Sequence, residues 1–223
     1  MVDSAEASEL YAEVVGFMER RLGLVVPPEM REVLVLAVDL ASLNEQREKT
    51  TNGHAHSVVR GLTLYSYATV THIAPGLWSL GAGYRPDSRA LFRTEVQREV
   101  TAVLVLVGMP RALTASVLAH EAMHVYLKLT KSFPIHLSSQ CEEGLCQYVS
   151  LRLLSTYLER PPASSDGQSA FQRSLLRYSL HCIEADPSVD YGEGFRKAKK
   201  CADALGLAVT LEHVAHTGDL PVV

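Results

Sequence analysis

The residues of this chain best suited to chemistry are His120, Glu121 and His124, which form the pattern H-E-x-x-H. They lie within residues 114–129, a segment without glycine or proline whose apolar residues have helical spacing. Residues four apart on a helix differ by about 40° around its axis, so both imidazoles lie on one face and can bind one ion. Glu121 is offset by about 100° and reaches the open side of that ion, where it can deprotonate a metal-bound water. The pattern therefore predicts a catalytic site with one Zn²⁺ per chain and Glu121 as general base.

The residues that follow this motif distinguish the classes of zinc peptidase that contain it. The motif alone arises by chance in roughly one shuffled sequence in forty, so a third ligand is needed to support it. A metzincin would have glycine and histidine at the positions of Leu127 and Thr130, which excludes that class. Cys141 and Cys146 offer thiolates, but they lie at the start of a predicted helix without a matching context.

A glutamate offers the third ligand at a recognised spacing. Glu143 follows His124 after eighteen intervening residues, which is the H-E-x-x-H-x18-E spacing of gluzincin peptidases, where the third ligand lies on the next helix. We expect His120, His124 and Glu143 to be the metal ligands, with the fourth position open as in catalytic zinc sites. Glu142 is expected either to orient a ligand or face the substrate, or to be a solvated residue at a helix N-terminus.

The transition state of peptide hydrolysis also needs an electrophile, which we expect from the C-terminal half of the chain. The candidates are His181, Tyr191 and Arg196. We take Tyr191 and His181 as the predicted catalytic partners of Glu121. The alternative for each is a packed side chain, because a lone histidine or tyrosine on a helical segment more often packs than reacts.

Composition and charge exclude several other functions. The 21 basic and 25 acidic residues give a net charge of −4 without a basic block, so we expect no binding of nucleic acid or of anionic membranes. The cysteines form no C-x-x-C pair, which excludes LIM and RING modules. Four cysteines without an apolar leader fit a reducing compartment, so we expect a soluble protein of the cytoplasm, with the nucleus as a second location.

The elements that must position the motif follow from hydrophobic periodicity. We expect one domain over residues 1–223, with a sheet-bearing half at 1–110 and a helical half at 111–223, which is an α+β fold. Segment 32–38 fits a short buried strand, and its continuation through Leu43 fits a helix equally well. The segment at 100–107 directly precedes the metal helix and is expected to be an edge strand for an extended substrate or a buried core strand. Strands are predicted at 58–65, 68–73 and 100–107, polar or Gly/Pro-rich loops at 47–56, 74–92 and 161–167, and helices at 4–21, 111–130, 142–160, 168–185, 192–205 and 208–216.

Several motifs in order resemble one known family. They are NGHAH at 52–56, RGLTL at 60–64, HEAMH at 120–124, CEEGLCQ at 141–147, DYGEGFR at 190–196 and TLEHVAHTGDLP at 210–221. In this order they resemble the peptidase region of the plant DA-one family of ubiquitin-activated, growth-regulating zinc metallopeptidases. The segment at 9–24 is also similar, so the resemblance covers nearly the whole chain.

The resemblance implies a gluzincin-like fold, in which a small twisted sheet packs on the H-E-x-x-H helix, and a zinc endopeptidase that cuts intracellular regulatory proteins. It implies protein substrates, with ubiquitin or ubiquitinated proteins as partners. It carries over His120, His124 and Glu143 as ligands and Glu121 as base. Members of the family have ubiquitin-interacting helices and a LIM module before the peptidase, and we expect neither in this chain. The segment around Tyr65 also departs from the family's acidic stretch, which puts substrate selection in question.

The sequence leaves a rival function from another class. A pseudoprotease would recognise partners in the ubiquitin pathway without cutting them. The complete metal motif with its glutamate base argues against this alternative. A small-molecule hydrolase such as a deformylase needs a cysteine ligand upstream of the helix, and no cysteine precedes His120.

Overall fold

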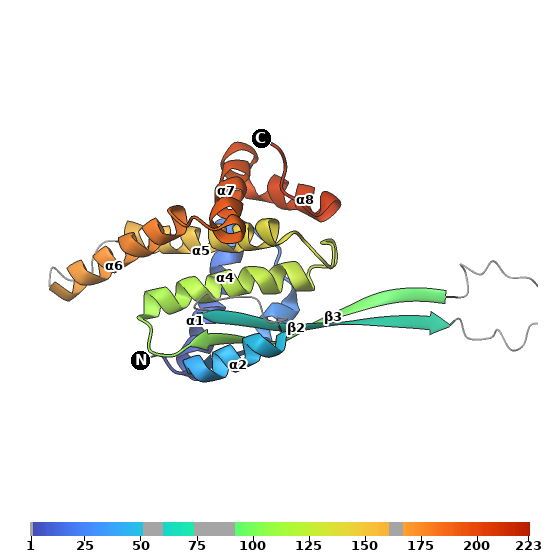
Figure 1. Cartoon of the computed structure of the whole chain (residues 1–223), viewed down its shortest axis with the longest axis horizontal. Helices are drawn as coiled ribbons and strands as arrows, with labels where there is room; N and C mark the ends of the chain where they lie inside the picture. Colours follow the sequence, from blue (N-terminus) through green and yellow to red (C-terminus); the bar gives the residue numbers. More distant parts are fainter. Residues whose placement is uncertain (1, 51–59, 74–91, 161–166) are drawn as a thin grey trace, which may run out of the picture.

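The structure is a computed structural model that describes residues 2–50, 60–73, 92–160 and 167–223. Its described part is an α+β fold, as predicted: a small mixed sheet lies against a larger set of helices (Figure 1). The motif NGHAH at 52–56 lies outside the described residues, as do most of the two loops predicted at 74–92 and 161–167. Among the described helices, none combines the length and the apolar character needed to span a bilayer.

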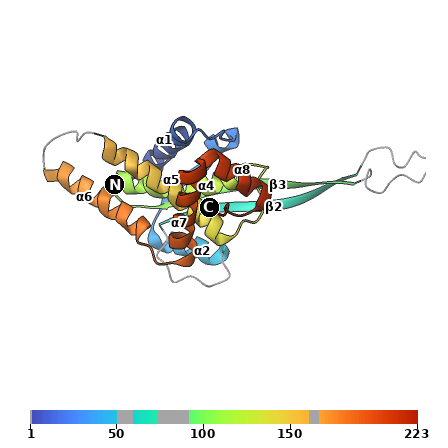
Figure 2. The same cartoon turned by 90° about the horizontal axis from the view of Figure 1, so that it is seen from above.

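The sheet contains three strands in the order β1-β3-β2. The strands are β1 at Leu34–Val38, β2 at Gly61–Ile73 and β3 at Phe92–Leu106. β1 runs parallel to β3, whereas β2 pairs antiparallel with β3 in a long hairpin that projects beyond the helices in both views (Figures 1 and 2). The register of β2 against β3 shifts once, between Leu64 and Tyr65.

Three predictions about the strands were wrong. Residues 61–65 and 68–73 belong to one strand, β2, because the register shift at Leu64 does not break the ladder. β3 begins at Phe92 rather than near residue 100, since its polar first half is held by pairing with β2 and not by burial. β3 is also the central strand of the sheet, so the expectation that it offers an edge to substrate is wrong, and its alternative as a core strand holds.

Helices cover both faces of the sheet where it has three strands, at residues 102–106 of β3. Val103 and Val105 of β3 belong to the main core, which also contains apolar residues of α1 (Ser4–Leu22), α4 (Arg111–Leu129) and α5 (Ser139–Glu159). Ala102 and Leu104 point to the other face and pack with Leu43 of α2 (Leu40–Thr50). Successive side chains of a strand point to opposite faces of the sheet, so this part of β3 is buried on both sides. This burial explains why residues 102–106 of β3 are a continuous apolar run in the sequence.

The segment after Glu32 contains both a strand and a helix, the two structures that its apolar pattern allowed. β1 takes up the first apolar residues, and α2 follows after Asp39, whose carboxylate accepts a hydrogen bond from the Ser42 amide at 2.7 Å. This bond caps the helix and separates it from the strand. The loop predicted at 47–56 was wrong for its first residues, since α2 continues through Thr50.

Two of the C-terminal helices and one short irregular helix pack on α5, and the last helix packs on the one before it. The predicted helix at 192–205 begins as a π-helical turn, so its first residues belong to η3 rather than to α7. π-helical turns are rare and occur often at functional sites. Besides the 3₁₀ turn η1 (Pro28–Arg31), the remaining elements are α6 (Gly167–Glu184), η3 (Val189–Glu193), α7 (Gly194–Leu205) and α8 (Leu207–Thr217).

The contact between α5 and α7 requires glycine on both sides. A Cβ atom at Gly144 would lie 2.3 Å from the carbonyl oxygen of Gly194, and one at Gly194 would lie 2.3 Å from the carbonyl oxygen of Gln140. We expect Gly144→Ala to lower the free energy of unfolding by about 1–3 kcal/mol, because neither backbone can give way to a methyl group. Gly16→Ala is the matched control, since its Cβ meets only the flexible end of Arg20. Urea denaturation measures both, and equal stability of the two variants would contradict the prediction.

Candidate metal centre

Donor atoms from α4 and α5 converge on one point. The Nε2 atoms of His120 and His124 lie 3.2 Å apart. The Oε2 atom of Glu143 lies 3.1 Å from Nε2 of His120 and 3.5 Å from Nε2 of His124. Donors at the corners of a tetrahedron around an ion about 2.0 Å away are about 3.3 Å apart. The three atoms therefore have the spacing of three ligands of one tetrahedral ion, with the fourth corner left open.

The carboxylate of Glu143 has the properties of a ligand. Its Oε2 atom is buried and makes no hydrogen bond of normal geometry. Burial alone would raise the pKa of Glu143, but the imidazoles of His124 and His120 hold it well below its ordinary value. The group is therefore ionised at neutral pH. An ionised, buried oxygen without a hydrogen bond is costly unless a cation satisfies it.

A cysteine offers a second possible donor set. Cys146 is fully buried on α5, and its sulfur lies within 4.8 Å of ligand nitrogens of His120 and His124, a group that could hold a metal ion. Burial raises the pKa of the Cys146 thiol to about 12, and only the thiolate is a good ligand. Glu143 is already ionised, so it is the better prepared of the two donors.

A chain of polar contacts fixes the orientation of His124. Its Nδ1 atom lies 2.8 Å from Oε1 of Glu142, whose side chain is 14% exposed. A carboxylate at Nδ1 favours the tautomer that leaves the lone pair of Nε2 free for a metal. Of the roles that the sequence left open for Glu142, the structure thus favours the one of orienting a ligand. Both oxygens of Glu142 also lie 2.7 Å from Nζ of Lys128.

Glu121, which directly follows His120 on α4, has a buried side chain that contacts β2. The Thr63 hydroxyl donates a hydrogen bond of 2.7 Å to Oε2 of Glu121. The other oxygen, Oε1, lies above Gly61, where a Cβ atom would approach it to 2.6 Å. One carboxylate oxygen is therefore held by a hydroxyl, and the other occupies space that only glycine leaves.

A methyl group at Gly61 tests this arrangement. It would collide with Oε1 of Glu121 and, also at 2.6 Å, with a methyl carbon of Val117. We expect Gly61→Ala to displace Glu121 and to lower any hydrolytic activity that depends on it by at least tenfold, because misplacement of a catalytic group by about 1 Å is costly. Metal content should stay unchanged, since the donors do not contact Gly61. Loss of metal together with activity, measured by elemental analysis and a cleavage assay, would contradict this prediction.

The structure distinguishes the three electrophile candidates by their distance from the cluster. The ring of Tyr191, in η3, stacks on the imidazole of His120 with 6.1 Å between centroids and 22° between planes. Burial raises the pKa of Tyr191, so its hydroxyl keeps its proton and can donate a hydrogen bond. His181 is exposed on α6, and in the described ranges no hydrogen bond, ion pair or ring contact joins it to the cluster. Arg196 instead donates a 2.9 Å hydrogen bond to the carbonyl of Asp186.

Sequence reasoning did not find the residues around the cluster. Gly61 and Thr63 lie in the motif RGLTL, but only the tertiary structure brings them to Glu121. Lys128 had a detectable signal, because it follows His124 by four residues and so lies on the same face of α4. The roles of the predicted ligands and of Glu121, Tyr191 and His181 stay predictions.

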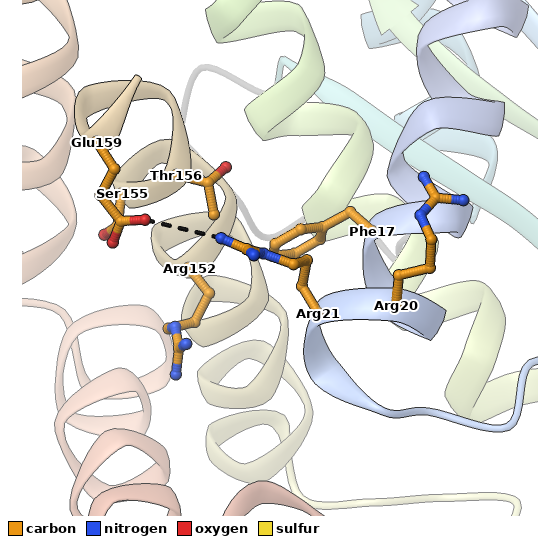
Figure 3. Close-up of a pocket in the computed structure, with 7 residues that line it drawn as sticks. All are labelled: Phe17, Arg20, Arg21, Arg152, Ser155, Thr156 and Glu159. Atoms are coloured by element: carbon orange, nitrogen blue, oxygen red, sulfur yellow. Dashed lines mark ion pairs between the residues drawn. The ribbon is translucent and has the colours of Figure 1, made fainter. Parts of the chain in front are cut away.

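A shallow pocket elsewhere is a poor candidate for a second site. It has a volume of about 330 Å³, and Figure 3 shows the side chains from α1 and α5 that line it. Its cations do not converge: Arg21 pairs with Glu159, Arg20 folds back over Gly16, and Arg152 over Tyr148 of its own helix. An anion would find no prepared group of donors in it.

The fold and the cluster together define an α+β protein with a candidate metal centre on two packed helices. Residues 28–217 match the family model DA1-like, described as Protein DA1. The chain therefore belongs to the DA1-like family, as the sequence motifs predicted. No solved structure matches it.

Similar proteins are known from two plants. The chain is 37% identical to Protein DA1 and 35% identical to Protein DA1-related 1, both of Arabidopsis thaliana. It is 33% identical to the LIM domain-containing protein HDR3 of Oryza sativa subsp. japonica. These alignments cover 99–100% of this chain but only 42–48% of the relatives. The chain thus spans less than half the length of these curated relatives.

Proposed function

We propose that this chain is a zinc-dependent endopeptidase domain that cleaves regulatory proteins inside the cell. The observation that carries the proposal is the convergence of His120, His124 and Glu143 at tetrahedral spacing, with Glu121 buried beside them. Two imidazoles, one carboxylate and an open fourth position are a typical donor set of a catalytic zinc site. Membership of the DA1-like family supports the proposal but does not by itself assign an activity.

Each side chain near the cluster has a role in this reaction. Bound zinc would polarise the peptide carbonyl and a water molecule. Glu121 takes a proton from the attacking water and passes it to the leaving amine. Thr63 keeps the base in place through its hydrogen bond to Oε2. Tyr191, above His120, donates its hydroxyl proton in a hydrogen bond to the developing oxyanion.

The edge of β2 is the place we assign to the substrate chain. Among the described strands, β2 pairs only with β3, so one of its edges has no partner strand. An extended peptide that adds to this edge by strand pairing would pass Thr63 and therefore Glu121. This replaces the assignment of the segment at 100–107, because β1 and β2 pair with β3 on both sides over residues 102–106.

The partners and location of the protein extend the same proposal. We propose protein substrates, with ubiquitin or ubiquitinated proteins as partners, and neither nucleic acid nor membrane as a ligand. The net charge of −4 supports the last part. Cys141, Cys146, Cys182 and Cys201 are free thiols, which suits the reducing cytoplasm or nucleus.

Metal content and cleavage together test the proposal. The purified protein is depleted with a chelator, reconstituted with zinc and analysed for metal. It is then incubated with reduced, carboxymethylated α-lactalbumin as an unfolded substrate, with and without added ubiquitin. We expect about one zinc per chain and cleavage that depends on it. Failure to bind zinc would overturn the proposal, whereas zinc without cleavage in either arm would favour the protein-binding alternative.

A further inference from the structure

Lys128 is a buried cation next to the metal centre that the proposed reaction does not use. It lies on α4, one turn after His124, and only 6% of its surface is exposed. Its ammonium group contacts both oxygens of Glu142 at 2.7 Å. A buried lysine is rare unless it is paired, because burial opposes its charge. We therefore expect the buried ammonium group of Lys128 to have a function at the proposed metal centre.

The surroundings of Lys128 keep it charged. Its Nζ atom lies 4.7 Å from the ring centre of Tyr65, on β2, in a cation–π contact. Tyr67, two residues along the same strand, also faces it. Burial works against the charged form, but the attraction of Glu142 outweighs it, so the pKa of Lys128 lies above its ordinary value. Lys128 and Glu142 form an ion pair, with Nζ 2.7 Å from both carboxylate oxygens.

The two adjacent glutamates of α5 contact opposite nitrogens of one imidazole. Glu142 lies at Nδ1 of His124, and Glu143 lies at Nε2, the nitrogen that faces His120. Both are carboxylates and both are largely buried, so either has the chemistry of a zinc ligand. What distinguishes them is that Glu142 has a fixed cation and Glu143 has none among the lysines and arginines described.

We propose that Lys128 is a positioning residue that decides which glutamate becomes the ligand. By holding both oxygens of Glu142, it keeps this carboxylate at Nδ1 of His124 and leaves Glu143 alone to face the metal. The inference depends on the proposed function, since it assumes a metal at the cluster. Its chemistry concerns the binding of the ion rather than the cleavage of a peptide.

A double-mutant cycle on zinc affinity tests the inference. Lys128→Met removes the cation, Glu142→Gln removes the charge that it holds, and the double variant removes both. We expect each single variant to bind zinc about 10–100-fold more weakly, the usual loss when an outer partner of a ligand is removed. The double variant should bind no more weakly than the weaker single one, because the two residues act as one unit. Affinity is measured by competition with a chromophoric zinc chelator.

Folding and spectroscopy provide the controls. Lys49→Met removes a surface lysine that pairs with Glu45 and should leave zinc affinity unchanged. Lys128→Met leaves Glu142 without its cation and is expected to be less stable, whereas the double variant should regain part of that stability. Cobalt substituted for zinc should give an altered visible spectrum in Lys128→Met, which a purely structural loss at a distant site would not produce.

The outcomes separate this inference from the proposed function. Wild-type protein that binds no zinc overturns both. If the wild-type protein binds zinc but the two single variants' losses of zinc affinity multiply in the double variant, only the role of Lys128 is overturned. Unchanged zinc affinity in Lys128→Met also overturns the role of Lys128 and leaves the proposed function standing. Equal affinities of the double variant and the weaker single variant support the inference.

Discussion

Replacing Glu121 with glutamine is expected to leave zinc bound and to lower the rate of peptide cleavage by about 10²–10⁴-fold, the usual contribution of a general base. Glutamine has nearly the same shape and can still accept a hydrogen bond from Thr63, so the fold around β2 should be kept. The amide cannot accept the proton of the attacking water. The measurement is the rate of cleavage of an unfolded protein, normalised to the zinc content of each variant.

An exposed glutamate provides the matched control for this change. Glu212 lies on the surface of α8, and Glu212→Gln removes the same charge without touching the cluster. It should cleave at the wild-type rate. If Glu121→Gln cleaves as fast as this control while carrying its zinc, Glu121 is not the base. If it loses zinc instead, its role is structural.

Removing Glu143 is expected to have the second large effect, the loss of zinc. Glu143→Ala takes away an ionised oxygen that faces both imidazoles, and we expect zinc affinity to fall by at least about 100-fold. Ligand-linked stability provides a second readout. Zinc at 100 times its dissociation constant should stabilise the wild-type protein by about 2.7 kcal/mol, and the same concentration should have little effect on the variant.

Cys146 provides the critical comparison, because it belongs to the competing donor set. Cys146→Ser should bind zinc nearly as tightly as the wild-type protein if Glu143 is the ligand, since the thiol is protonated at neutral pH. The opposite pattern, with Glu143→Ala binding well and Cys146→Ser binding poorly, would assign the third position to sulfur. That result would also replace the catalytic donor set with one that contains a thiolate.

That His120, His124 and Glu143 lie close together was predictable, because their spacing is local. His120 and His124 lie one turn apart on a single helix, and Glu143 lies near the start of the next helix along the chain. Helical periodicity alone places His120 and His124 on the same face of the helix. The spacing to the third is a family pattern, and the packing of α4 against α5 gives it a physical meaning.

The rest of the site depends on contacts between distant segments, which periodicity does not encode. Thr63 meets Glu121 across 58 positions of the sequence. The order β1-β3-β2 likewise follows from pairing between strands, so a central strand could not be distinguished from an edge strand by its residue pattern. The polar half of β3 was missed for a related reason: hydrogen bonds to β2 hold it, and a search for buried apolar residues does not detect such a strand.

One strand, β2, contacts both the proposed base and the lysine that holds the partner of a proposed metal ligand. Gly61 and Thr63 of β2 contact Glu121, and Tyr65 and Tyr67 face Lys128, whose partner Glu142 holds His124. The proposed base Glu121 and the proposed ligand His124 thus both depend on contacts with one strand, whose other end lies in the projecting β2–β3 hairpin (Figure 1). A slip of β2 by one residue, about 3.3 Å, would release both contacts in the same movement. In the proposed mechanism, a displacement of β2 would therefore impair both proton transfer by Glu121 and metal binding by His124.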